Sequence, residues 1–219
     1  MAQQIFPGVY RINGKLCTVS TLKGFKVHDE DIIKAEGKEF RDWDPFHSKL
    51  AAAISRGLKA WPFRDNASVL YLGAANGVTC SFLSDAMPNG TIYAVEFSAQ
   101  SGRDLITVSE KKQNLLPIIE DARFPERYSD SIDGKVDVVY EDVSDREQVQ
   151  ILIGNCDRYL KNGGIAMLAV KSRSIDSSAP PRQIYARVIS ELRDHFEVLE
   201  KLDLGMFERD HMFLVLKKN

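Results

Sequence analysis

The 219-residue sequence is poor in cysteine, in long apolar runs and in surplus positive charge. Its three cysteines, Cys17, Cys80 and Cys156, are odd in number and far apart, which argues against a disulfide framework or a zinc knuckle and predicts buried, reduced thiols. No apolar run approaches the roughly 20 residues that a membrane span requires. The first residues, MAQQIFPGVY, lack a basic segment followed by an apolar one. We therefore expect a cytoplasmic protein with no membrane partner.

The formal net charge is −2 and the isoelectric point is about 6.1. A protein that grips nucleic acid unaided usually carries a surplus of Lys and Arg. If the substrate is RNA, we therefore expect other molecules to hold much of it. There is no repeat, low-complexity tract or Arg/Gly-rich tail, and the length suits one α/β domain with a small appendage.

Residues 68–97 predict a βαβ unit. An apolar run at 69–72 leads into the small-residue turn GAANG, an apolar-periodic helix over 79–86, a second apolar run at 92–95, and then Glu96. Such a unit places a nucleoside-type site at its mouth. A carboxylate at the end of the second strand can bind both hydroxyls of a ribose.

The turn of this unit departs from the full G-x-G-x-x-G pattern, because Ala75 stands where a second glycine would be. Gly73 and Gly77 still allow a close backbone approach to a ligand. A nucleoside ligand without a diphosphate, such as S-adenosylmethionine (SAM), therefore fits better than NAD. A sheet turn that binds no ligand remains an alternative at this point.

The rest of the chain alternates strands and helices. Short β-prone pieces at 5–12, 16–20 and 39–42 predict a small antiparallel subdomain. Further on, we expect helices over 50–58 (capped by Ser48), 101–114, 145–160 and 181–196, a loop over 123–135, and strands at 116–120, 136–140, 165–170, 197–202 and 212–216. This order predicts a parallel, doubly wound sheet closed by an antiparallel pair.

Titratable side chains follow several of these strands. In an open α/β sheet the ligand lies outside the carboxyl ends of the strands. Asp121, Asp142 and Lys171 each follow such an end. His211 begins the final antiparallel strand, and Lys49 begins the helix that precedes the first strand of the sheet, so both reach the same edge. We therefore expect two lysines, an aspartate and a histidine to face one ligand.

This set of residue types suits methyl transfer to a sugar hydroxyl. Lysines do not bind metals, so no metal site is predicted, and the G-x-S-x-G elbow of a serine hydrolase is absent. Lys171 can accept or polarise the hydroxyl proton, Asp142 can orient that lysine, and Lys49 and His211 can steer the acceptor. Alternatives remain for single residues: Asp142 as the N-cap of the next helix, and Lys171 and His211 as solvated surface side chains.

Eight short motifs lie in order along the chain. They are WDPFHSKLAAAI (43–54), YLGAANGVT (71–79), YAVEFSAQSGRDL (93–105), LPIIEDAR (116–123), DVVYEDV (137–143), LKNGG (160–164), VKSRSID (170–176) and FERDH (207–211). Together they resemble the fibrillarin family of RNA ribose 2'-O-methyltransferases. The resemblance implies a Rossmann-like, SAM-dependent methyltransferase fold over residues 46–219, with a doubly wound seven-stranded α/β sheet and an antiparallel last strand, after a small N-terminal antiparallel β subdomain over residues 1–45.

The resemblance also implies roles for individual residues. By position, the family's catalytic set falls on Lys49, Asp142, Lys171 and His211. SAM is the implied cofactor, with contacts from Gly73, Ala74, Val78, Thr79, Glu96, Phe97, Asp121, Ala122, Asp142 and Val143. Of these, Glu96 would bind the ribose hydroxyls, Phe97 would stack on the adenine, and Asp121 with Ala122 would read the amino edge of the adenine.

The resemblance further implies the catalytic subunit of a box C/D guide ribonucleoprotein. The implied partners are a box C/D guide RNA, a target rRNA or tRNA, a Nop-domain scaffold protein and a kink-turn-binding ribosomal-type protein. The implied location is the cytoplasm for an archaeal-type protein and the nucleolus for a eukaryotic one. A structural ribonucleoprotein subunit with weakened activity and a small-molecule O-methyltransferase remain the alternatives.

Three positions depart from the usual family pattern. Val78 replaces a threonine, Ser144–Asp145 replace Ala-Gln, and His47 replaces an arginine. The first two departures are the reason to keep a weakly active subunit as an alternative. Two nearby aromatic residues, Trp43 and Phe46, either stack on an RNA base or pack the N-terminal subdomain onto the rest of the protein.

Overall fold

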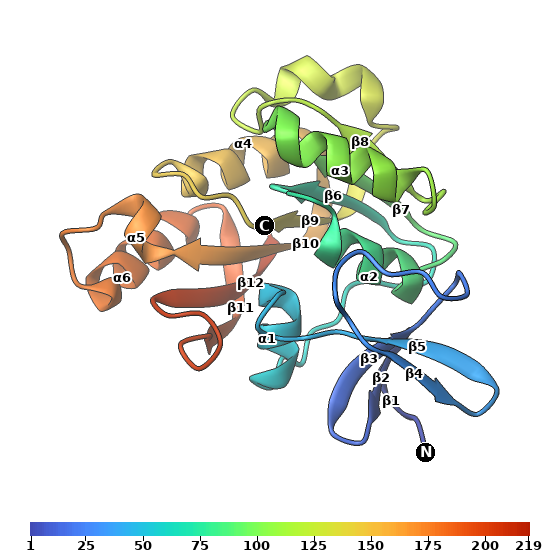
Figure 1. The fold of residues 1–219 in the computed structure, drawn as a ribbon. Helices are drawn as coiled ribbons and strands as arrows, with labels where there is room; N and C mark the ends of the chain where they lie inside the picture. The colour runs from blue at the N-terminus through green and yellow to red at the C-terminus, as the bar shows by residue number, and fades with distance from the viewer.

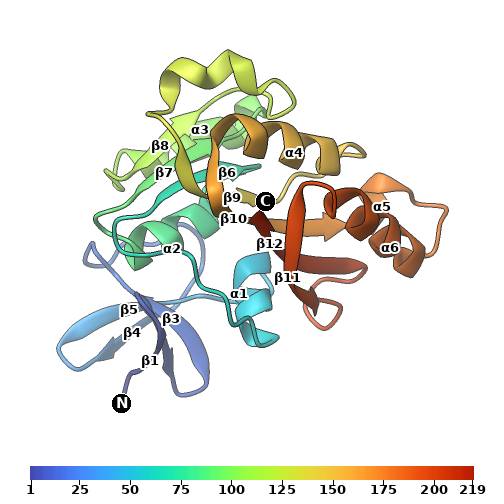
Figure 2. The same cartoon turned by 180° about the vertical axis from the view of Figure 1, so that it is seen from behind.

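The computed structural model describes all residues from 1 to 219 and contains two β-sheets. The first forty-two residues form a five-stranded antiparallel sheet in the order β1-β2-β3-β5-β4. The remainder forms a seven-stranded sheet in the order β11-β12-β10-β9-β6-β7-β8, with helices packed on it. The small sheet, in blue, lies next to α2 in both views (Figure 1, Figure 2).

The small sheet has more strands than the sequence predicts. Its strands are β1 (Gln3–Phe6), β2 (Val9–Ile12), β3 (Lys15–Val19), β4 (Ile32–Ala35) and β5 (Lys38–Asp42). The expected single strand over 5–12 is wrong, because the chain reverses at Gly8, which has a φ of 75°. Strand β4 was not predicted, and it pairs with β5 through a tight turn in which Glu36 and Gly37 both adopt positive φ.

The large sheet has the predicted doubly wound order. Its elements are α1 (Lys49–Ser55), β6 (Ser68–Leu72), α2 (Val78–Ala86), β7 (Thr91–Val95), α3 (Ala99–Ser109), β8 (Leu115–Ile118), β9 (Val136–Glu141), α4 (Gln148–Tyr159), β10 (Leu160–Lys171), α5 (Ser172–Ile175), α6 (Pro181–Leu192), β11 (Phe196–Asp203) and β12 (His211–Lys218). Strand β12 runs antiparallel to both of its neighbours, and the other pairs are parallel. The predicted fold class, including the antiparallel last strand, is confirmed.

Several predicted boundaries shift. The helix predicted to start at 145 starts at Gln148 with Glu147 as its N-cap, so the interpretation of Asp142 as the N-cap is wrong. The strand predicted to end at 120 ends at Ile118, which leaves Asp121 three residues beyond it. The loop predicted over 123–135 contains a 3-10 helix, Pro125–Ser131, begun by a proline that is preorganised for a first helical turn.

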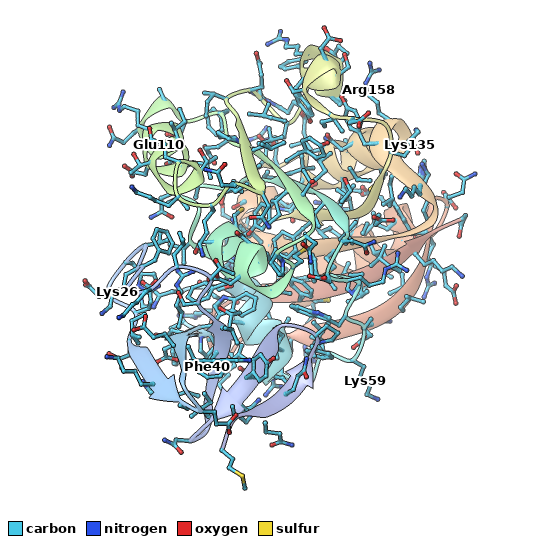
Figure 3. All side chains as sticks on the ribbon, turned by 90° about the vertical axis from the view of Figure 1, so that its right-hand side faces the viewer. Lys26, Phe40, Lys59, Glu110, Lys135 and Arg158 are labelled. Carbon is cyan, nitrogen blue, oxygen red and sulfur yellow. The ribbon has the colours of Figure 1, made fainter.

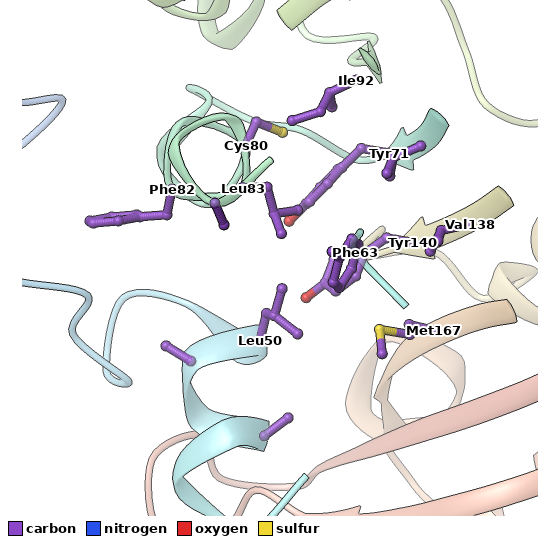
Figure 4. Packing of buried hydrophobic residues seen from close by; sticks show 14 of the residues in the cluster. Leu50, Phe63, Tyr71, Cys80, Phe82, Leu83, Ile92, Val138, Tyr140 and Met167 are labelled. Carbon is purple, nitrogen blue, oxygen red and sulfur yellow. The ribbon is translucent and has the colours of Figure 1, made fainter. Parts of the chain in front are cut away.

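Two hydrophobic clusters fill the two faces of the large sheet. One cluster of 31 buried residues lies under α1, α2 and α3, and one of 27 lies under α4 and α6. Figure 4 shows part of the first, where Leu50 of α1 and Leu83 of α2 approach Tyr71 and Tyr140 of the central strands. Val9 of the small sheet belongs to the same cluster. The two sheets thus share a core, and a domain boundary near residue 45 stays a prediction.

The surface is charged, and the cysteines are internal. Exposed side chains such as Lys26, Lys59, Glu110, Lys135 and Arg158 project from the periphery (Figure 3). The three cysteines are free and buried, as predicted. None of the helices combines the length and the apolar composition that crossing a bilayer requires.

A buried cluster of charges joins the small sheet to the rest of the protein. The Arg41 side chain is fully buried, and its guanidinium lies 2.7 Å from Glu30 and 2.8 Å from Asp85 of α2. The guanidinium also lies 4.1 Å from the centre of the Phe82 ring. Lys112, beyond α3, is buried against Asp85, and burial lowers the pKa of its ammonium. Three separate parts of the chain therefore meet at Asp85.

We predict that Arg41→Met lowers the free energy of unfolding by about 3–5 kcal/mol, because it leaves buried Glu30 without its arginine counterion and leaves Lys112 as the remaining cation on Asp85. The matched control is Arg187→Met. Arg187 is half exposed and lies 3.9 Å from Glu191, so its loss costs at most about 1 kcal/mol. Urea unfolding followed by circular dichroism measures both. Equal losses in the two variants contradict a structural role for the buried cluster.

Candidate active site

The carboxyl ends of the central strands stop in one row. Leu72 of β6 pairs with Val95 of β7 on one side and with Glu141 of β9 on the other. The residue after β9, Asp142, still donates its backbone N–H to the Leu72 carbonyl at 2.9 Å. The residues that follow these strands therefore emerge side by side at one edge of the sheet, which we call the rim.

A cavity of about 350 Å³ opens at the rim, a size suited to a small molecule. Its walls come from the segments that follow β6, β7, β8, β9 and β10 and from α3 and α4. Of the ten predicted cofactor contacts, those that line it are Gly73, Glu96, Phe97, Asp121, Ala122, Asp142 and Val143. Those that do not line it are Ala74, Val78 and Thr79.

The three residues outside the cavity have other surroundings. Ala74 is buried within the turn. The Thr79 hydroxyl donates to Ser48 Oγ at 3.0 Å. Val78 lines a separate hollow beside Asn76. A role for these three residues in cofactor binding stays a prediction.

Glu96 is fixed before any ligand arrives. It is 7% exposed, and its two carboxylate oxygens accept the backbone N–H groups of Ala75 and Ser98, each at 2.8 Å. Each oxygen keeps further lone pairs for a ligand hydroxyl. The neighbouring Phe97 ring is 73% exposed at the cavity mouth. A carboxylate and a flat ring side by side fit the ribose and the base of a nucleoside.

Gly73 allows two walls of the cavity to approach each other. Its φ is 79°, and a Cβ there would lie 3.0 Å from the backbone carbonyl carbon and oxygen of Asp142. Any other residue would push apart the segments that follow β6 and β9. This cradle, together with Glu96 and Phe97, fits the nucleoside part of SAM.

Arg123 is a cavity residue that sequence reasoning missed. Its guanidinium hydrogen bonds to the Asp121 carboxylate, with a closest distance of 2.6 Å, and this contact lowers the pKa of Asp121. Asp121 is therefore an anion that already accepts hydrogen bonds from Arg123. A ligand amino group that binds Asp121 has to share the carboxylate with this arginine. The short Asp-x-Arg spacing was the only available signal.

Asp142 is the meeting point of two lysines. Lys171 Nζ lies 2.8 Å from Asp142 Oδ1, and it donates to the Asp142 carbonyl at 2.8 Å and to Ser144 Oγ at 2.9 Å. Lys49 Nζ lies 3.5 Å from Asp142 Oδ2 and 3.8 Å from Glu208 Oε1. Sequence reasoning had not identified Glu208 or Ser144 as neighbours of these lysines.

The helix start places Lys49. Ser48 is the N-cap of α1, as predicted, and its Oγ accepts the Ala51 N–H at 3.3 Å. Lys49 is thus the first helical residue. Since the Thr79 hydroxyl of α2 donates to the same Ser48 oxygen, the start of α1 is tied to the start of α2.

His211 joins the set through the sheet rather than through a direct bond. It pairs with Lys171 across the antiparallel β10–β12 ladder, so both residues point to one face of the sheet. Its Nδ1 lies 2.7 Å from the Arg209 carbonyl, which accepts the Nδ1 proton and leaves Nε2 as an acceptor when the ring is neutral. The structure therefore brings Lys49, Asp142 and Lys171 into contact, with His211 on the adjacent strand.

Glu141 is a second carboxyl group below the rim. It is fully buried, and neither of its carboxyl oxygens has a hydrogen-bond partner. Burial raises its pKa well above the ordinary value for glutamate, which favours the protonated, neutral form of the group. Nowhere in the chain are three or more His, Cys, Asp or Glu side chains arranged to hold a metal ion.

The fold and the rim define a class of protein. A doubly wound seven-stranded sheet with an antiparallel last strand, and a cavity for a small molecule beyond its central strands, are typical of the Rossmann-like methyltransferases. Within that class, the family model described as Fibrillarin matches residues 1–219. The chain belongs to the fibrillarin family.

Similar proteins agree with this placement. The fibrillarin-like rRNA/tRNA 2'-O-methyltransferase of Pyrococcus furiosus is 45% identical over 97% of this chain and 96% of its own length. A crystal structure of a fibrillarin/Nop5p complex matches with a TM-score of 0.92 and 35% identity, over 99% of this chain and all of the matched chain. Aeropyrum pernix fibrillarin, solved with natively bound S-adenosyl-L-methionine, matches with a TM-score of 0.86 and 38% identity, over 95% of this chain and 92% of that one.

We predict that Gly73→Ala lowers the free energy of unfolding by about 2–4 kcal/mol, because it adds a backbone clash to the strain of a left-handed conformation. Gly134→Ala is the control, since Gly134 has a φ of 67° but open space around its Cβ position. Its loss should be limited to the conformational part, about 1–2 kcal/mol. Chemical unfolding compares the two, and indistinguishable losses would refute the close approach to Asp142.

We predict that Glu141→Gln stabilises the protein at pH 7 and has little effect at pH 4. Glutamate in the unfolded chain ionises above about pH 4.3, whereas burial raises the pKa of Glu141 in the folded protein. The folded state is therefore stabilised less as the pH rises from about 4. The neutral amide of glutamine does not ionise, so it removes this loss of stability. We expect the free energy of unfolding at pH 7 to rise by at least about 1.4 kcal/mol, the value for a pKa raised by one unit. Unfolding curves of Glu141→Gln at pH 4 and pH 7 test this prediction, with Glu110→Gln, at an exposed position, as the control. A gain in stability that is the same at both pH values argues against a raised pKa of Glu141.

Proposed function

We propose that this protein is a SAM-dependent RNA ribose 2'-O-methyltransferase that acts on rRNA and tRNA as the catalytic subunit of a box C/D guide ribonucleoprotein. One observation carries the proposal: the Asp142 carboxylate, in the wall of the cavity beside Glu96 and Phe97, is contacted by two lysines from distant segments. The name of the Pyrococcus furiosus relative supports the reaction and the substrates.

The cavity supports SAM as the cofactor. SAM supplies an electrophilic methyl group on a sulfonium when it is bound. Glu96 binds the ribose hydroxyls, and Phe97 covers the adenine. At Gly73, the absence of a side chain lets the protein backbone lie close to the ligand. Bound SAM in the Aeropyrum pernix relative supports the same assignment. Of the departures from the family pattern, Val78 lies outside the cavity lining, whereas Ser144–Asp145 lie in it. A structural subunit with weakened activity therefore stays the alternative on the strength of Ser144–Asp145 alone.

The catalytic residues act on the acceptor hydroxyl. The ribose 2'-oxygen attacks the methyl carbon as the carbon–sulfur bond breaks, so the hydroxyl proton has to leave. Lys171, in its neutral form, takes that proton. The oxygens of Asp142 and Ser144 at 2.8–2.9 Å then hold the new ammonium. Asp142 keeps Lys171 in place, and Lys49 and His211 orient the hydroxyl and its neighbouring phosphate.

The acceptor side favours RNA over a small apolar metabolite. Lys49 provides positive charge beside Asp142, and Lys171 adds to it whenever it is protonated, that is, before it loses its proton and after it has taken the hydroxyl proton. Charge of this sign suits a hydroxyl flanked by phosphates. The net charge of −2 gives little general affinity for RNA. We therefore propose that a guide RNA, a Nop-domain scaffold protein and a kink-turn-binding ribosomal-type protein hold the target.

The partners and the location follow the same argument. The fibrillarin/Nop5p complex supports a Nop-domain partner, because its fibrillarin chain aligns with almost the whole of this one. The relatives of 39–45% identity include proteins from Pyrococcus and Methanocaldococcus, which supports an archaeal-type protein that works in the cytoplasm.

Methyl transfer from labelled SAM to a guide-matched RNA tests the proposal, with and without the reconstituted partners. We expect label on one target ribose, dependent on the guide RNA and lost in Asp142→Ala. Full-rate labelling of bare RNA would sink the guided mechanism. If an assembled wild-type complex transfers no label, calorimetric titration with SAM then distinguishes a structural subunit from an enzyme with another acceptor.

Two substitutions of Lys171 separate proton transfer from simple charge. Lys171→Ala should lower kcat by roughly 10²–10⁴, the usual contribution of a general base. Lys171→Arg keeps the positive charge beside Asp142 but cannot release a proton at ordinary pH. We expect it to lose as much activity as the alanine variant. Recovery of most of the activity with arginine would assign Lys171 to electrostatic orientation instead.

A further inference from the structure

Two phenylalanines from distant segments meet beside the rim. Phe46 precedes α1, and Phe207 lies between β11 and β12; their ring centres are 5.2 Å apart, with planes at 74°. Phe207 is half-buried and packs on the hydrophobic core, whereas Phe46 is 59% exposed. We call Phe46 and Phe207 the aromatic pair. Its inner ring supports the outer ring, and the outer ring faces solvent.

The aromatic pair belongs to the segments that carry the candidate catalytic residues. Lys49 follows Phe46 by three positions, and Glu208 follows Phe207 directly. Lys49 Nζ lies 3.8 Å from Glu208 Oε1, so the two segments touch a second time there. Lys49 reaches Asp142 from outside the cofactor cavity, which it does not line. The aromatic pair therefore lies on the acceptor side of Asp142.

The turns that carry the pair are held by their own hydrogen bonds. The Phe46 N–H donates to the Asp44 carboxylate at 2.9 Å, and the imidazole of His47 lies 3.1 Å from the same carboxylate. The Phe207 N–H donates to the Leu204 carbonyl at 2.8 Å. The Phe46 ring is thus presented by an ordered turn, and a ligand that covers it gains the free energy of burying apolar area.

The charge around the pair indicates the chemistry of that ligand. Arg209 is 93% exposed in its side chain, and its nearest carboxylate, that of Asp210, lies 3.9 Å away. The large exposed apolar residues on the segments that carry the pair are Phe46 and Met206, which are 59% and 68% exposed. A protein partner needs a broader apolar patch.

Two carboxylates of the segments that carry the pair are already engaged. Asp44 accepts the Phe46 N–H. Glu208 is paired with Lys49. An exposed flat ring on segments that also carry an exposed arginine matches a nucleotide, whose base stacks on aromatic rings and whose phosphate pairs with Arg.

We propose that Phe46, backed by Phe207, packs against a nucleotide of the acceptor RNA next to the methylated ribose, and that Arg209 pairs with a phosphate of the same strand. This inference rests on the proposed function. Trp43, the other aromatic residue of this segment, has no such role, because it is fully buried and stacks on Phe82 with ring centres 5.2 Å apart.

Steady-state kinetics of the reconstituted complex tests the inference. Phe46→Ala should raise the KM for guide-matched RNA about 5- to 150-fold, which corresponds to the 1–3 kcal/mol of a stacking contact. The SAM dissociation constant should not change, and Phe46→Tyr should restore the KM. Leu199→Ala is the control, since Leu199 is also exposed, at 40%, but lies on the edge strand β11. An unchanged KM for Phe46→Ala, while wild type methylates RNA, overturns the inference alone; absence of wild-type methylation overturns the proposed function.

Photo-crosslinking identifies the occupant directly, including in a case where Phe46→Ala fails to assemble. Benzoylphenylalanine at position 46 should form an adduct with the acceptor RNA in the irradiated complex, and the same group at position 199 should not. An adduct with the scaffold protein alone, or no RNA adduct from an assembled complex, overturns the inference.

Discussion

The parallel ladder that ends β6, β7 and β9 in one row is the constraint on which the site depends. Because Leu72 pairs with both Val95 and Glu141, the residues beyond the strands emerge together. A slip of one residue would turn their side chains to the other face of the sheet. Asp142 consequently serves two neighbours at once: it forms part of the cofactor cavity and is the counterion of Lys49 and Lys171.

Residues far from the cavity hold this arrangement in place. The small sheet is joined to α2 through fully buried Arg41 and Asp85, and α2 in turn contacts Ser48, the cap that fixes the start of α1. Lys49 is the first residue of that helix. The position of one candidate catalytic lysine is therefore linked to the packing of the N-terminal sheet, which shares a hydrophobic core with the large sheet.

Much of the fold was predictable from the sequence, because alternating apolar strands and amphipathic helices allow few connected arrangements. The row of strand ends also predicted that Lys49, Asp142 and Lys171 would meet. Boundaries were less predictable. Strand β4 is only four residues long, with one exposed and no fully buried residue, so it lacks a clear alternation of burial. Helix α4 begins at Gln148 rather than at the expected residue 145, and the alternative of a cap at Asp142 is wrong, since local patterns do not specify where a loop ends.

Residue types and their spacing were enough to predict the glycine turn after β6, the carboxylate of Glu96 after β7 and the charged rim, because the backbone periodicity of strands decides which residues follow their ends. The partners of these groups depended on the folded chain. Ser144 beside Lys171, Glu208 beside Lys49 and Arg123 on Asp121 are contacts made by loop side chains. Such contacts depend on loop conformations and side-chain rotamers, which packing across the whole protein determines. The spacing of residues in the sequence therefore does not predict them.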